Sequence, residues 1–297
     1  MGFLDKIKQN LEIKPLLMEA VCVALIVFYG GIGWAYEAYA TFQRTYPTAT
    51  STPAAPVKSY IPLQFISINS SMVSNGCINF LLMSVLTWIA APISGGHLNP
   101  AITVGYILTK NIELIKGLLY IAAQLAGSIA GAFLYGFATP GFIKEVAEYA
   151  NVITGLPKQH ESFGYQSLVI QILGSFCLMF VFYALRIEKR AGNNSSFGVA
   201  IGALTAASVM CFGEFTYHKP GTKVTDKLHG VSVQSNMNPA RVFGPMLLNL
   251  FSFKFKHLLY AFIGPVIGAA TLSLIYKWFL HKKESEEEDE ENMMEME

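Results

Sequence analysis

Long apolar runs separated by short polar links dominate the pattern of hydrophobic and polar positions along this chain. A helix rises about 1.5 Å per residue, so about 20 apolar residues cross a hydrocarbon core about 30 Å thick. A chain that crosses the membrane an even number of times has both of its ends on the same face. Six runs reach this length and predict membrane-spanning helices: 16–36, 63–90, 114–137, 168–187, 197–215 and 258–280.

Two further apolar runs are too short to cross a bilayer, and the same tripeptide opens each of them. Asn99-Pro100-Ala101 precedes the first, and Asn238-Pro239-Ala240 precedes the second. Proline suits the first position of a helix, and an Asn before it caps the free backbone N–H groups. Helices over 100–108 and 239–250 would rise roughly 13 to 18 Å, about half of the hydrocarbon core. We therefore expect two half-length helices.

The two halves of the chain repeat a pattern of polar residues within apolar sequence. Glu19 precedes Phe28 by nine residues, and Gln171 precedes Phe180 by nine. Each half then holds three spans and one Asn-Pro-Ala motif, so the halves insert with opposite orientation. Interrupted segments in corresponding positions of inverted halves indicate a site near the middle of the membrane. The sequence predicts an all-α membrane protein with six transmembrane helices and two re-entrant half-helices in an inverted repeat.

Composition sets the limits of the domains and the class of protein. With 53% hydrophobic residues, 14% charged residues and a mean hydropathy of +0.41, the chain is too apolar for an ordinary soluble protein. We expect a cytoplasmic N-terminal segment over 1–15 and a membrane domain over 16–281, with repeats over 16–138 and 165–281. An acidic, disordered tail follows over 282–297. Lys and Arg in the short loops favour cytoplasmic termini, although the choice between plasma and intracellular membrane stays open.

Sequence signatures of catalysis are missing from the chain. It has no Gly-rich phosphate loop, no HExxH and no nucleophile elbow, and its four Cys and six His are dispersed. We therefore expect no enzyme activity, no catalytic residue, no cofactor, no metal site and no nucleic-acid partner.

The motifs themselves predict a polar passage. Each Asn carries an amide that donates hydrogen bonds, and the positive ends of two half-helix dipoles meet beside them. Non-helical backbone at membrane depth is tolerated where it lines a cavity, so the loop before each motif should present carbonyl groups to water. The alternative is that each Asn only caps its helix. The expected carbonyl ladder comprises Gly95, Gly96, His97, Leu98, Gln234, Asn236 and Met237.

With these residues, the chain resembles the aquaporin (major intrinsic protein) family over about 16–281. The resemblance rests on the stretch 94–101 around the first motif, on Arg241 with Phe243-Gly244-Pro245 after the second, and on Ile263-Gly264-Pro265 in the last span. It implies an hourglass pore in each protomer and, by family habit, a homotetramer in the lipid bilayer.

The resemblance also implies roles for charged and polar residues inside the membrane. It assigns Arg241 to the outer constriction, where a fixed positive charge repels cations; the alternative is a structural ion pair. Glu19 is implied to be a structural acceptor for loop N–H groups. Gln171 stands where the family usually has a second Glu and keeps an acceptor without the charge.

The constriction implied by the resemblance is atypical in this chain. Asn79 falls where water-selective members carry an aromatic residue, Val209 where they carry His, and Ser235 where mercury-sensitive members carry Cys. With Arg241 these residues would form a wider filter. A register one residue away on the second or fifth span is the alternative.

The resemblance implies a passive channel that conducts water and excludes protons and ions. Val242 replaces the Asp that the glycerol-conducting branch usually has after the motif and its Arg. Small neutral solutes, including hydrogen peroxide, ammonia, urea and glycerol, remain further candidates, so an aquaglyceroporin-like or peroxide- or ammonia-permeable channel stays open. A closed-pore structural membrane protein and a secondary transporter are the rival classes.

Overall fold

The computed structural model describes part of the chain in enough detail to place the site. Its backbone is described over residues 11–45, 61–139, 164–187, 196–212, 215–216, 230–231, 236–248 and 259–280. Gln234, Ser235 and the acidic tail lie outside these residues, as do the first ten residues of the N-terminal segment.

The first half of the chain forms three long helices and one short one. Helix α2 covers Ile13–Thr45, α3 covers Ile61–Ser94 and α5 covers Leu114–Ala138. Between α3 and α5 lies the short helix α4, Pro100–Leu108, with the bounds expected from the sequence.

The second half repeats this order with several interruptions. Helix α7 (Gly164–Phe182) continues into a π-helical turn, η2 (Tyr183–Ile187), and α8 covers Phe197–Phe212. Two short strands, β1 (Phe215–Thr216) and β2 (Gly230–Val231), pair antiparallel before the short helix α9 (Pro239–Leu248). The remaining elements form one last span in three pieces: η4 (Leu259–Ile263), α11 (Gly264–Ile275) and η5 (Tyr276–Leu280).

The fold prediction of six spans and two half-helices is confirmed, with differences at the ends. Five described helices are long and apolar enough to cross a membrane, and α8 is a shorter apolar helix. The expected span 197–215 is wrong at its end, because α8 stops at Phe212 and Phe215 lies in β1. Helix α2 continues to Thr45, nine residues beyond the expected end.

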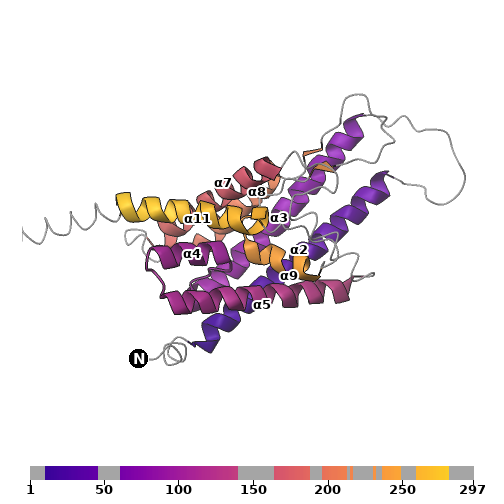
Figure 1. Cartoon of the computed structure of the whole chain (residues 1–297). Helices are drawn as coiled ribbons and strands as arrows, with labels where there is room; N and C mark the ends of the chain where they lie inside the picture. The colour runs from indigo at the N-terminus through magenta and orange to yellow at the C-terminus, as the bar shows by residue number, and fades with distance from the viewer. Residues whose placement is uncertain are drawn as a thin grey trace, which may run out of the picture.

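The two short helices lie inside the bundle, between the longer ones (Figure 1). Each packs against the last long helix of the other half, since α4 contacts α11 and α9 contacts α5. Helix α2 packs on α5 as α7 packs on α11, and α3 packs on α8 across the centre. This exchange of half-helices makes the two halves one structural unit.

Glycines allow the closest helix contacts at matching places in both halves. A Cβ on Gly127 of α5 would collide with the backbone of Ala20, and a Cβ on Gly268 of α11 would collide with the backbone of Ile172. Ala20 and Ile172 directly follow Glu19 and Gln171, the two residues whose repetition indicated a duplication. Small residues that let helices approach closely are typical of membrane helix packing.

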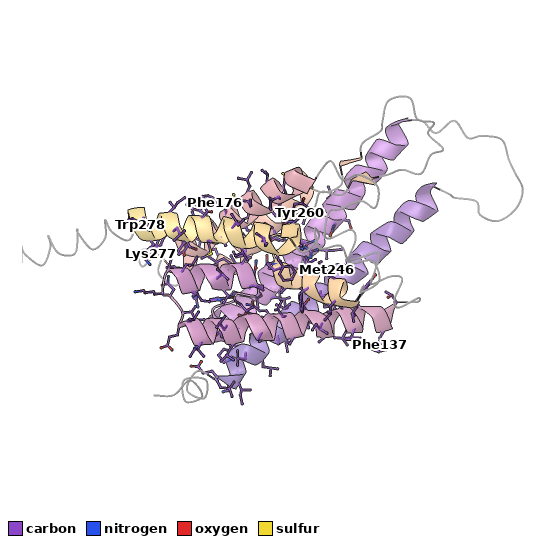
Figure 2. The ribbon with its side chains drawn as sticks, in the orientation of Figure 1. Phe137, Phe176, Met246, Tyr260, Lys277 and Trp278 are labelled. Atoms are coloured by element: carbon purple, nitrogen blue, oxygen red, sulfur yellow. The ribbon has the colours of Figure 1, made fainter. Side chains whose placement is uncertain are left out.

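Polar and apolar side chains are distributed as lipid requires. Phe137 and Trp278 are 80% and 71% exposed and project from the outside of the bundle (Figure 2). Glu19, Gln124 and Gln171 are fully buried. Because lipid is apolar, an exposed aromatic surface costs nothing there, whereas polar side chains must find partners inside the protein.

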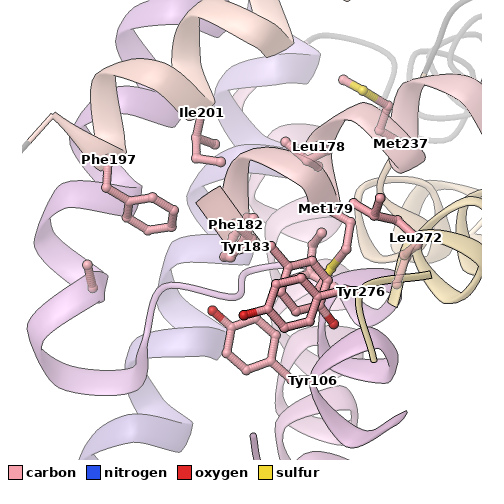
Figure 3. Close-up of a cluster of buried hydrophobic side chains, with 14 residues drawn as sticks. Tyr106, Leu178, Met179, Phe182, Tyr183, Phe197, Ile201, Met237, Leu272 and Tyr276 are labelled. Carbon is pink, nitrogen blue, oxygen red and sulfur yellow. The ribbon is translucent and has the colours of Figure 1, made fainter. Parts of the chain in front are cut away.

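Two apolar clusters fill the interior, and each of them includes one of the short helices. One contains residues of α2, α3, α5 and α9, including Val23, Leu86, Tyr135 and Val242. The other joins α4, α7, α8 and α11, and Figure 3 shows its aromatic part. There Tyr183 stacks on Tyr276 with ring centroids 4.2 Å apart.

Candidate functional site

The chain enters both short helices through a residue with left-handed backbone. Leu98, before Asn99, has a φ of 49°, and Met237, before Asn238, has a φ of 51°. A non-glycine residue rarely adopts this conformation, so the surrounding structure must enforce it at both places. The matching angles show that the two loops turn into their helices in the same way.

Glu19 of α2 holds the loop before the first motif. Its carboxylate accepts from the backbone N–H of Leu98 at 2.6 Å and of His97 at 3.1 Å. The hydroxyl of Ser94 donates to it at 2.6 Å, and the amide of Gln124 donates at 2.7 Å. Four donors thus satisfy a carboxylate that has no access to solvent.

Gln171 of α7 does the same for the loop before the second motif. Its Oε1 accepts from the backbone N–H of Asn236 and of Met237, both at 2.9 Å. A neutral amide oxygen therefore replaces the carboxylate in the second half. The loop geometry depends on a buried acceptor, not on its charge.

Each motif Asn joins its own helix to the opposite loop. The side-chain oxygen of Asn99 accepts from the N–H of Ala101 at 2.9 Å, and that of Asn238 accepts from the N–H of Ala240 at 3.0 Å. The amide nitrogen of Asn99 donates to the carbonyl of Met237 at 2.8 Å. That of Asn238 donates to the carbonyl of Leu98, also at 2.8 Å. The Asn side chains are helix caps, and they also cross-link the two halves.

These crossed bonds use one of the two N–H groups of each amide. An Asn amide has two donors, so each motif leaves a second N–H where the two half-helices meet. The N-termini of α4 and α9 also bring unpaired backbone N–H groups and the positive ends of their dipoles to this place. The centre of the site is therefore a cluster of hydrogen-bond donors.

Arg241 is the third residue of α9 and is only 7% exposed. The salt bridge found among the described residues joins Lys116 to Glu12, so Arg241 has no carboxylate partner there. Its Nε has no hydrogen-bond partner among those residues either. A structural ion pair with a described residue, the alternative raised by the sequence, is thus ruled out.

A family model described as "Major intrinsic protein" matches residues 6–276. The chain belongs to the major intrinsic protein family. Aquaporin TIP1-2 of Musa acuminata is 29% identical to it over 89% of this chain and 85% of that protein. Probable aquaporin TIP2-2 of Arabidopsis thaliana is 33% identical over 63% of this chain and 64% of that protein.

A solved structure has the same fold. The X-ray structure of the aquaglyceroporin from Plasmodium falciparum superposes with a TM-score of 0.55, 16% identity, and coverage of 89% of this chain and 95% of that one. Together with the family match, these likenesses support a passive channel for water or small solutes and a multi-pass integral membrane protein. Major intrinsic proteins are channels and not enzymes.

The structure describes three of the four residues expected at the outer constriction, Asn79, Val209 and Arg241. Asn79 of α3 is buried and donates to the backbone and side-chain oxygens of Asn75, one turn away. Val209 of α8 is also buried. Thr205 lies one turn before Val209 on the same buried face, and the sequence analysis missed it. Residues four apart share a helix face, so both are candidates for this position.

Two carbonyls of the expected ladder have hydrogen-bond donors within the protein. The carbonyls of Leu98 and Met237 were expected to face water, but each accepts a hydrogen bond from the opposite Asn. The carbonyl of Met237 also accepts from Ser175. A carbonyl has two lone pairs, so both of those on the Met237 oxygen are used, whereas the Leu98 oxygen keeps one for water. Asn236 has an unexpected feature, because its buried amide finds no hydrogen-bond partner among the described residues.

Polar residues of α5 that sequence reasoning missed hold both motifs in place. Gln124 donates to Glu19 and to Thr103 of α4. The hydroxyl of Ser128 donates to the carbonyl of Ala240 and accepts from the N–H of Gly244 in α9. Gln124 and Ser128 are four residues apart in an otherwise apolar helix, and this spacing is a signal that could have revealed them.

Proposed function

We propose that this protein is a channel with water as its main permeant, which excludes protons and cations at the two Asn-Pro-Ala motifs. The observation that carries the proposal is the pair of crossed bonds between Asn99 and the Met237 carbonyl and between Asn238 and the Leu98 carbonyl. They fix the two amides so that each keeps one N–H for a passing oxygen atom.

A water molecule that accepts from both amides has its oxygen lone pairs occupied. It can then hardly accept a proton from a neighbouring water, so a hydrogen-bonded proton relay stops at this point. Aquaporins are a known case in which the positive ends of half-helix dipoles add a barrier to protons and cations. Arg241, buried without a described carboxylate partner, extends the positive field toward one mouth.

We further propose that Asn79, Ser235 and Arg241 contribute to the outer constriction, together with Val209 or Thr205. The amide of Asn79 donates to Asn75 and the hydroxyl of Thr205 donates to the carbonyl of Ile201, so the oxygen atoms of these two side chains would offer acceptors to small neutral solutes beside water. By analogy with the family, the protein would assemble as a homotetramer with both termini in the cytoplasm.

Osmotic shrinkage of proteoliposomes, followed by stopped-flow light scattering, tests the main proposal. We expect liposomes with the full-length protein to shrink faster than empty liposomes. The rate should depend only weakly on temperature, because the pore replaces the hydrogen bonds that water has in bulk. Re-swelling in a glycerol gradient should be much slower than the water phase. Shrinkage no faster than in empty liposomes would contradict the open channel.

Two substitutions on α8 decide which residue faces the permeant. If Thr205 lines the constriction, Thr205→Val should change the ratio of urea to water permeability by about threefold or more, since a hydrogen-bonding partner for urea is lost. Val209→Thr serves as the reciprocal variant and should leave the ratio unchanged. The opposite pattern would assign the position to Val209. Urea and water permeabilities of the same proteoliposome preparation give the ratio directly.

A further inference from the structure

Helix α9 carries Arg241 at its third position, and the turn that follows cannot have the hydrogen bonds of a regular helix. In a regular helix the carbonyl of Ala240 accepts from the N–H of Gly244, and the carbonyl of Arg241 accepts from the N–H of residue 245. Residue 245 is a proline, which has no N–H and whose ring crowds the carbonyl four residues earlier. The Arg241 carbonyl therefore cannot accept the bond that a regular helix would give it.

A side chain of α5 contacts α9 at the step just before this proline. The hydroxyl of Ser128 accepts from the N–H of Gly244 at 2.7 Å and donates to the carbonyl of Ala240. Ser128 thus bridges the two groups that a regular helix joins directly. Ser128 and Ala240 are both fully buried, so the bridge is shielded from solvent.

The bridge holds one end of the peptide unit that joins Ala240 to Arg241. The carbonyl of this unit accepts from Ser128, and its N–H, which belongs to Arg241, donates to the carbonyl of Asn238 at 3.1 Å. A peptide unit is planar, so hydrogen bonds at both of its ends fix its orientation. The orientation of this plane sets the direction in which the side chain of Arg241 leaves the backbone.

Close packing of α5 on α9 makes the bridge possible. A Cβ on Gly244 would collide with the backbone carbonyl of Ser128. The two helices lie side by side in the bundle (Figure 1). The backbone of α9 is therefore close enough to α5 for a side chain as short as serine to reach it.

The guanidinium end of Arg241 has no comparable support among the described residues. Its Nε finds no hydrogen-bond partner there, and no described carboxylate pairs with it. The place of the guanidinium therefore depends on how the backbone presents the side chain.

The inverted repeat offers an internal comparison. The glycine before Ser128 in α5 matches Gly268 in α11, so Ala269 corresponds to Ser128. Ile102 stands in α4 where Arg241 stands in α9, because each directly follows its Asn-Pro-Ala motif. A hydroxyl is thus present beside the half-helix that carries the arginine, and an alanine beside the half-helix that does not.

We propose that Ser128 is a positioning residue for Arg241, and that its hydroxyl keeps the guanidinium where it restricts the passage of solutes larger than water. This proposal rests on the outer constriction proposed above. Without the hydroxyl, the Ala240 carbonyl and the Gly244 N–H can bond each other directly, which would turn the peptide before Arg241. Selectivity depends on pore diameter and on the donors that line the pore, so a displaced guanidinium should admit larger neutral solutes.

Four variants separate this role from general support of the fold. Ser128→Ala removes the bridge, and Ser128→Thr keeps a hydroxyl at the same place. Ser273→Ala is the matched control, because Ser273 is an equally buried serine of α11 whose hydroxyl donates to the carbonyl of Ala269 within its own helix. Arg241→Ala is made alone and together with Ser128→Ala, which shows whether the hydroxyl acts through the arginine. Glycerol and water permeabilities are measured on the full-length proteins in proteoliposomes.

We expect Ser128→Ala to raise the ratio of glycerol to water permeability by about threefold or more, with Ser128→Thr and Ser273→Ala near the wild-type ratio. In the Arg241→Ala background, Ser128→Ala should leave the ratio unchanged, because the guanidinium that the hydroxyl positions is already gone. An unchanged ratio in Ser128→Ala alone would overturn the proposal. An equal rise in both backgrounds would overturn it too, since the hydroxyl would then act without the arginine.

The same set of proteins distinguishes this proposal from those on which it rests. If Arg241→Ala leaves the ratio at its wild-type value, the outer constriction fails and the positioning role fails with it. If Arg241→Ala raises the ratio and Ser128→Ala does not, only the positioning role is wrong. Loss of the folded Ser128→Ala protein from its size-exclusion peak would also contradict the proposal, because the hydroxyl would then support the fold as a whole. The channel proposal itself fails only if the wild-type protein does not conduct water.

Discussion

Asn99→Asp should lower water permeability per protein by about tenfold or more, which corresponds to about 1.4 kcal/mol in the barrier. The aspartate keeps the cap, because its oxygen still accepts from the N–H of Ala101. It loses both N–H donors, so a carboxylate oxygen faces the Met237 carbonyl across the present 2.8 Å. Repulsion between these two acceptors should shift the second loop and remove the donor offered to passing water.

The inverted repeat supplies the comparison for this experiment. Asn238→Asp should have a similar effect through the Leu98 carbonyl, and the double variant should lose little more than either single one, because each breaks the same cross-linked unit. Asn111→Asp is a control with the same chemical change at an exposed position. Stopped-flow shrinkage of proteoliposomes measures all four proteins. Normal permeability of Asn99→Asp would show that the crossed amides are not needed for conduction.

Glu19→Ala should strongly destabilise the folded protein. It leaves the buried N–H groups of His97 and Leu98 without an acceptor, at a cost of about 1–3 kcal/mol each. A total of about 2–6 kcal/mol is a large fraction of the stability of a typical protein. Thermal unfolding of the detergent-solubilised protein, followed by the loss of its size-exclusion peak, measures the change.

Glu19→Gln should be much milder, and Gln171 gives the reason. Its single amide oxygen already accepts two loop N–H groups at 2.9 Å in the second half. The new amide at 19 would meet the amide of Gln124, but the oxygen of Gln124 is buried without a described partner and can turn toward it. Glu12→Gln, which removes an exposed carboxylate, is the control for the loss of charge. Equal destabilisation by Gln and Ala at 19 would mean that the charge itself is required.

The sequence predicted those parts of the fold that depend on local pattern. Hydrophobic length located the spans, and the Asn-Pro-Ala tripeptides placed the starts of α4 and α9 correctly. The end of α8 was missed because Phe215 continues the apolar run although it pairs in a strand. Hydropathy reports whether a residue can sit in lipid, and it does not report where the backbone changes its hydrogen-bonding partner.

The candidate site was predictable in its residues but less so in its contacts. The pairing of Asn99 and Asn238 with the opposite loops depends on how two distant segments meet, and no local pattern encodes this. The same holds for Arg186, which ends an ordinary span in the sequence, because its hydrogen bond to the Ala91 carbonyl is visible only when α3 and η2 are placed in space. Gln124 and Ser128 on α5 differ, because their spacing of four residues in a largely apolar helix is a local signal that could have revealed them.

The crossed bonds between the two motifs also bear on how the protein is made. Asn99 is translated well before Met237, whose carbonyl accepts its hydrogen bond. Likewise, the carbonyl of Leu98 has no donor from the second motif until Asn238 has been translated. A growing chain that has inserted only its first three spans holds half of the polar centre, with no second half-helix opposite α4. The passage is completed only when α9 arrives, near the end of synthesis. A partly made chain thus lacks a finished pore, and the membrane that receives it stays sealed until the last elements are in place.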